Sequence, residues 1–100
     1  MKIKLTQEIL ASLPKLYATE DVPLADKVAV CKFFDPCGSY TLYAVEYDGR
    51  DTFFGWVDGC PEPELGYFSL SEMESVRGPL GIGIERDLHF KPAKLAEVMK

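Results

Sequence analysis

The chain has 100 residues, of which 47% are hydrophobic and 27% are charged, and its formal net charge is −5. This length predicts a single domain over residues 1–100, and the composition is that of a globular protein. The eleven Lys and Arg residues are scattered, which argues against a nucleic-acid partner because phosphate binding requires clustered basic side chains.

The sequence also predicts a cytoplasmic protein that does not enter a membrane. No stretch approaches the roughly 18 apolar residues of a membrane span. No long apolar run follows the N-terminal residues, so we expect no signal peptide. Cys31, Cys37 and Cys60 form no CxxC pair, and we expect them to be reduced thiols.

The first predicted element is a helix over residues 5–13, with Thr6 as its N-cap and Pro14 ending it. Residues 14–26 are expected to be irregular. Residues 27–70 hold ten of the twelve aromatic residues, and turn-forming Gly, Pro and Asp divide them. This stretch predicts four short strands, at residues 28–34, 40–47, 52–57 and 65–69.

The two central strands are apolar on both faces. An antiparallel sheet with one face in water should alternate apolar and polar residues. We therefore expect either that other elements cover both faces or that one face meets a partner. Trp56, in the middle of a strand, is expected to be buried. One face is predicted to carry Leu42, Ala44, Phe53, Gly55 and Val57, and the other Tyr43, Val45, Tyr47, Phe54 and Trp56.

Helix signals follow the fourth strand. Ser69 and Glu72 form a capping-box pattern, and Gly78 with Pro79 would end the helix that they begin. Alternating apolar residues predict a fifth extended segment over residues 80–90, and a short helix closes the sequence. The predicted fold class is α+β, a four- to five-stranded antiparallel meander with flanking N-terminal, middle and C-terminal short helices.

In such a meander the first and third turns lie at the same end of the sheet. We interpret that end as a candidate surface for a partner protein with a basic patch. No catalytic residue, cofactor or metal ligand set follows from the sequence, and it does not indicate an oligomeric state. The candidate surface consists of Asp35, Cys37, Asp58, Cys60, Glu62 and Glu64.

An alternative interpretation stays open, namely a small metal-binding protein or enzyme. Thiols and carboxylates at the turn end could bind a metal, although two turns about 10 Å apart would have to approach one ion. His89 is the single histidine, and the enzyme hypothesis would use it with this cluster. The segment over residues 86–89 is otherwise expected to carry an ion pair or a buried hydrogen bond.

Four segments together resemble a known family. They are residues 14–21 (PKLYATED), 31–36 (CKFFDP), 64–70 (ELGYFSL) and 84–90 (IERDLHF). The chain resembles, from about residue 13 onward, a family of small bacterial and phage proteins catalogued as a domain of unknown function. That family is common on plasmids and integrative elements. The resemblance implies a mobile-element setting and a link to anti-restriction, and it implies no catalytic residue and no cofactor. We therefore expect a non-enzymatic accessory protein that binds another protein.

Overall fold

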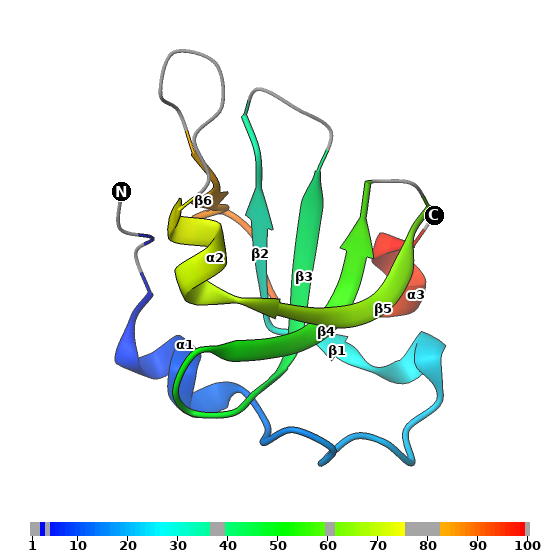
Figure 1. The fold of residues 1–100 in the computed structure, drawn as a ribbon. Coiled ribbons are helices and arrows are strands. Elements are labelled where there is room, and N and C mark those ends of the chain that lie inside the picture. Colours follow the sequence, from blue (N-terminus) through cyan, green and yellow to red (C-terminus); the bar gives the residue numbers. More distant parts are fainter. Residues whose placement is uncertain (1–2, 4, 37–39, 60–61, 76–82, 100) are drawn as a thin grey trace.

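The computed structural model describes residue 3 and residues 5–36, 40–59, 62–75 and 83–99. These residues form an α+β fold with a five-stranded antiparallel sheet, in the order β5-β4-β3-β2-β6, and a two-stranded sheet of β1 and β7 (Figure 1). The predicted fold class is confirmed. The elements are α1 (Gln7–Ser12), η1 (Leu24–Asp26), β1 (Val28–Ala29), β2 (Cys31–Phe34), β3 (Thr41–Tyr47), β4 (Thr52–Asp58), β5 (Glu64–Ser69), α2 (Leu70–Ser75), β6 (Glu85–Arg86), β7 (Ala93–Lys94) and α3 (Leu95–Val98).

The predicted first strand is divided in two. Val30 lies between β1 and β2, and its N–H donates to the Ala44 carbonyl at 2.8 Å. β2 continues into the meander next to β3, whereas β1 pairs with β7 in the second sheet. The prediction of one strand over residues 28–34 is therefore wrong at Val30, because the two halves have different partners.

In residues 83–90, the described part of the predicted fifth extended segment, strand pairing with β2 is limited to Glu85 and Arg86 and is shorter than expected. A turn follows, in which the Phe90 N–H donates to the Asp87 carbonyl at 3.3 Å. The last hydrogen bond to β2 runs from the Asp87 N–H to the Lys32 carbonyl, whereas the alternating apolar pattern continues to Phe90. The predicted helix stop at Gly78 and Pro79 lies outside the described residues.

A β-bulge in β3 changes the predicted faces of the sheet. Ala44 pairs with Gly55 and Glu46 pairs with Phe54, so Val45 is an extra residue on β3. One extra residue reverses the facing of every side chain beyond it. Tyr47 accordingly stacks on Phe53, with ring centroids 4.5 Å apart, and the prediction that it shares the face of Phe54 is wrong.

Two apolar clusters cover the two faces of the sheet. The larger cluster, around Phe33, Leu42 and Phe53, packs with residues of α1 and with Met73 of α2. The smaller cluster packs Tyr43 and Val45 against Leu95 of α3. Figure 1 shows α1 and α2 together on one side and α3 on the other. Since elements of the chain cover both faces, the apolar faces do not require a partner.

Helix starts follow the predicted capping. The Thr6 hydroxyl accepts the Ile9 N–H at 3.2 Å, and the Ser69 hydroxyl accepts the Glu72 N–H at 3.1 Å. Trp56, expected to be buried, is half-buried and packs against the smaller cluster. None of the helices in the described ranges is long and apolar enough to cross a membrane.

Candidate functional site

The predicted turn end exists in the structure. Asp35 donates its N–H to the Tyr40 carbonyl at 3.0 Å in the first turn, and Thr41 pairs with Asp58 at the end of β4. The second of these contacts places the first turn beside the loop that follows β4. A Cβ on Gly59 would lie 2.7 Å from the Tyr40 ring, so this ring lies against the second loop. Strand order therefore brings the two loops to one end of the sheet, as predicted.

The four predicted site residues that the structure describes do not form a uniform surface. Glu64 is exposed at the start of β5, Glu62 is exposed just before it, and Asp58 is half-buried at the end of β4. Asp35 instead lines a hollow of about 500 Å³ that also contains Lys32 and Asp87. The acidic character is thus greater on the β4–β5 side. Cys37 and Cys60 lie outside the described residues.

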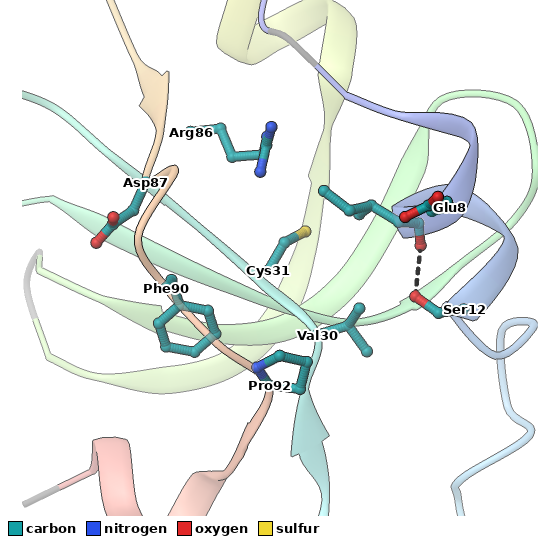
Figure 2. A pocket seen from close by; sticks show the side chains of 9 residues that line it. Glu8, Ser12, Val30, Cys31, Arg86, Asp87, Phe90 and Pro92 are labelled. Carbon is teal, nitrogen blue, oxygen red and sulfur yellow. Dashed lines mark hydrogen bonds between the residues drawn. The ribbon is translucent and has the colours of Figure 1, made fainter.

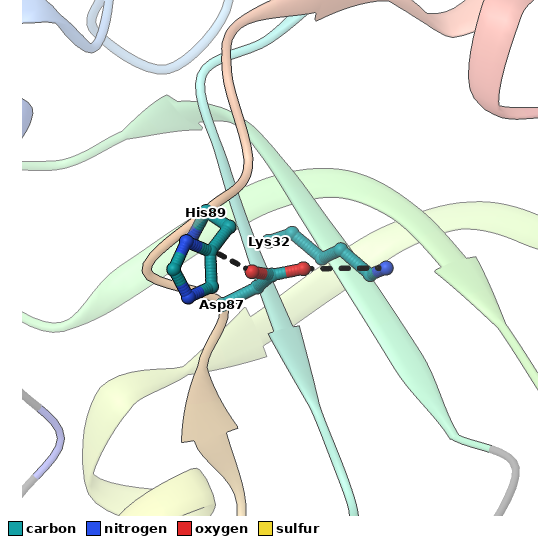
Figure 3. Close-up of polar contacts among 3 residues, drawn as sticks. All are labelled: Lys32, Asp87 and His89. Carbon is teal, nitrogen blue, oxygen red and sulfur yellow. Dashed lines mark hydrogen bonds and ion pairs between the residues drawn. The ribbon is translucent and has the colours of Figure 1, made fainter.

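His89 lies away from the turn end. β6 runs antiparallel to β2, with Glu85 opposite Phe34 and the Asp87 N–H bonded to the Lys32 carbonyl at 2.9 Å, so the chain moves away from the first turn before it reaches His89. The Asp87 carboxylate forms an ion pair with Lys32 at 3.6 Å and accepts the backbone N–H of His89 at 2.9 Å (Figure 3). The predicted ion pair is present. A catalytic histidine is usually oriented through its ring, and this contact uses the backbone.

A second hollow, of about 270 Å³, lies between α1 and β6 and contains the Cys31 thiol. Figure 2 shows Cys31 between Arg86 and Glu8 in that view. Burial raises the pKa of the Cys31 thiol to about 12, even though the nearby Arg86 acts to lower it. The thiolate is the nucleophilic form of cysteine, so Cys31 is poorly suited to nucleophilic catalysis at neutral pH.

Sequence reasoning missed a buried carboxylate, Glu46, which is 3% exposed. It accepts the backbone N–H of Tyr17 at 2.7 Å and that of Thr19 at 3.0 Å, and it also accepts the Thr19 hydroxyl. Lys27, which is 6% exposed, donates a hydrogen bond from its ammonium group to the Thr19 carbonyl. The sequence contains a signal for this site. Glu46 is the one charged residue in a largely apolar strand, and a buried charge requires partners.

These contacts fix the segment that carries Tyr17. Tyr17 has a φ of +70°, a left-handed conformation that is uncommon for a bulky residue. Its side chain is 64% exposed, and Tyr67 of β5 is 54% exposed. The Tyr67 hydroxyl donates to the Tyr17 hydroxyl at 3.3 Å, and this bond raises the pKa of Tyr67. The Tyr67 ring also lies 5.0 Å from that of Phe54. We call Tyr17, Phe54 and Tyr67 the tyrosine platform.

The described residues contain no group of three or more His, Cys, Asp or Glu side chains placed to hold a metal ion. That finding does not extend to Cys37 and Cys60, which belonged to the predicted cluster. The described part of the chain instead displays exposed carboxylates, Glu62 and Glu64, at and just before the start of β5, and an exposed Tyr67 ring further along the same strand.

Fold and surface define a small α+β protein built on an antiparallel meander. Residues 4–98 match the family described as "Protein of unknown function (DUF2958)", and the chain belongs to that family. The resemblance to a domain of unknown function is thereby confirmed. Comparison with curated proteins and with solved structures gave no match.

Proposed function

We propose that the chain is a non-enzymatic accessory protein that binds another protein through the acidic margin of β4 and β5, which consists of Asp58, Glu62 and Glu64. The observation that carries the proposal is charge. Between Arg50 and Arg77 the sequence has six carboxylates and no Lys or Arg. Of these, Glu62, Glu64 and Glu72 are exposed. A surface of one sign steers an oppositely charged partner and excludes others, so the partner presents a basic patch.

The setting of the proposal comes from the sequence. The resemblance to proteins carried on plasmids and integrative elements supports a mobile-element or phage origin and a link to anti-restriction. The odd number of cysteines, with no CxxC pair among them, supports reduced thiols and so a cytoplasmic location. The raised pKa of Cys31 and the backbone contact of His89 favour binding over catalysis.

The test is an affinity pull-down from the native host with mass spectrometry of the captured proteins. We expect the double reversal Glu62→Lys and Glu64→Lys to weaken capture by about tenfold or more, and capture by the unaltered chain to fall as salt rises. Thermal stability should change little, because exposed substitutions usually cost within about 0.5 kcal/mol.

The matched control is Glu8→Lys with Glu85→Lys. These carboxylates are also exposed, but they lie on α1 and β6, so the control makes the same change in net charge at another surface. The control should retain the partner. Equal loss from both variants would indicate a general charge effect and would reject the acidic margin as the binding surface.

The metal-binding alternative has its own measurement. Elemental analysis of protein purified without a metal column should find less than about 0.1 equivalent of zinc or iron if the chain is a binding protein. One equivalent that disappears in a Cys37→Ser, Cys60→Ser variant would favour the alternative.

A further inference from the structure

The outer edge of β5 is open in the described part of the chain. There, β4 is the one strand that pairs with β5, and β5 ends the five-stranded sheet. β5 has six residues and contains neither Lys nor Pro, the residues that commonly protect an edge strand from pairing. The opposite edge, β6, has only two residues. β5 is therefore the edge at which an added strand has room to pair.

The register shows which backbone groups face that edge. The Leu70 N–H donates to the Asp51 carbonyl at 2.8 Å, one position beyond the Thr52–Ser69 pair. Antiparallel ladders alternate between hydrogen-bonded and non-hydrogen-bonded pairs, so Gly66 and its alternate neighbours bond to β4. The N–H and C=O groups of Leu65 and Tyr67 consequently point away from β4, toward the open edge.

The tyrosine platform lies beside this edge. A residue of an added strand opposite Tyr67 would place its side chain on the same face of the sheet as the Tyr67 ring. The exposed ring of Tyr17 is held there by its hydroxyl contact with Tyr67 and by the Glu46 carboxylate that accepts its N–H. Aromatic faces attract cationic side chains, and Tyr is enriched at protein interfaces.

The charge of the region selects the occupant. A second copy of this chain would bring its own β4–β5–α2 unit alongside, which carries no Lys or Arg between Arg50 and Arg77. Like charges would repel across such a pairing, whereas a basic segment would be attracted. We propose that the open edge of β5 receives an extended segment of the partner, bearing Lys or Arg, as an additional strand whose cationic side chains contact the tyrosine platform. This rests on the proposed function, because it specifies how the same partner binds.

The probe is a synthetic peptide of about ten residues in which Lys alternates with Val, a length that suits one strand. We expect its addition to shift the backbone amide resonances of Leu65 and Tyr67 in the full chain and to slow the hydrogen exchange of these two amides. The same peptide with every backbone nitrogen methylated keeps its charge but cannot pair as a strand, and a peptide with Glu in place of Lys has the opposite charge. Both should bind at least about tenfold more weakly.

Two pairs of variants separate the backbone contact from the side-chain contact. Leu65→Pro and Leu65→Ala both remove the leucine side chain, but only Pro removes the outward N–H, so only Pro should lower peptide affinity by about tenfold or more. Tyr67→Ala should also lower it by about tenfold. The control Leu88→Ala removes another exposed side chain, 65% exposed, and should leave affinity unchanged.

Three outcomes would overturn strand addition: undiminished binding of the methylated peptide, shifts confined to residues outside β5, or concentration-dependent pairing of β5 with itself in the absence of peptide. If Leu65→Pro does not fold, the methylated peptide still decides. If strand addition fails but the reversal of Glu62 and Glu64 still abolishes capture of a native partner, the proposed function stands and only strand addition is rejected. If the peptide binds at β5 but no native partner is captured, strand addition stands and the proposed function is rejected.

Discussion

A single buried carboxylate organises the segment before the sheet. Glu46 lies inside because the extra residue Val45 turns it toward the Tyr17–Thr19 loop, where backbone N–H groups complete its hydrogen bonding. Those N–H groups would otherwise have to be solvated by water. The loop therefore depends on Glu46 for its conformation, including the left-handed Tyr17.

We predict that Glu46→Gln lowers the free energy of unfolding by about 2–4 kcal/mol, because an amide group offers donors where the loop needs acceptors. Urea denaturation measures the change. Glu64→Gln on the exposed start of β5 makes the same chemical replacement and should stay within about 0.5 kcal/mol of the unaltered protein. Equal changes in the free energy of unfolding for the two variants would show that the Glu46 contacts contribute little to stability.

We predict that the protein loses stability in alkaline solution because its Cys31 thiol is buried. Burial raises its pKa from the ordinary value of 9.0 to about 12. Between these two pH values the unfolded chain releases the proton and the folded chain retains it, so the free energy of unfolding should fall as pH rises through this window. Burial also raises the pKa of Tyr43 and Tyr47, and this adds to the same trend.

Denaturation of a Cys37→Ser, Cys60→Ser protein, with and without Cys31→Ala, isolates the contribution of this thiol. The variant with Ala should show the shallower decline with pH. Alkylation of Cys31 near neutral pH should require unfolding, and rapid labelling of the folded protein would contradict the buried, protonated thiol.

At the scale of elements, a pair of glycines lets the meander bend. Gly55 of β4 pairs with Gly66 of β5, and Figure 1 shows both strands curving across the rest of the sheet. The two positions have different surroundings. A Cβ on Gly55 would lie 1.8 Å from the Tyr43 carbonyl oxygen, whereas one on Gly66 would meet only the Val57 side chain, at 3.9 Å.

We predict that Gly55→Ala costs about 3 kcal/mol or more, because backbone must move to admit the methyl group. Gly66→Ala should change the free energy of unfolding by no more than about 1 kcal/mol. Thermal denaturation of the two variants provides the comparison. Similar stabilities would mean that β4 does not approach β3 as closely as described.

At the scale of elements, the sequence correctly predicted those features that depend on neighbouring residues. Thr6 and Ser69 cap their helices as predicted, since a cap depends on residues within one turn. The Val45 bulge has no local signal, and it alone moved Tyr47 to the other face. The division at Val30 depends on β7, which lies far along the sequence. The acidic turn end followed from strand order, whereas the tyrosine platform depends on a loop conformation that spacing cannot predict.

For the whole molecule, the central point is that the sheet separates two cores of unequal size. Met73 belongs to the larger core, and Leu95 belongs to the smaller one together with Trp56, the only tryptophan. Leu95 is fully buried, and Met73 is 3% exposed. Trp56 fluorescence therefore reports on one face of the sheet.

We predict that Leu95→Ala and Met73→Ala each cost about 2–5 kcal/mol, the usual range for truncation of a buried side chain. Only Leu95→Ala should shift the native Trp56 emission to the red, because it loosens the packing around that ring. Emission spectra below the unfolding transition measure this. A red shift in both variants would mean that the two cores are not independent.

The pairing of β1 with β7 sets an order of events during protein synthesis. Val28 pairs with Lys94, and the Leu95 N–H donates to the Lys27 carbonyl at 2.8 Å. A nascent chain emerging from the ribosome can form the helices and strands up to α2 while Tyr43 and Val45 still lack the cover that α3 provides. That apolar face stays open to chaperones until residues 93–98 have emerged from the ribosome, so a chain truncated before them would present one side of its sheet uncovered.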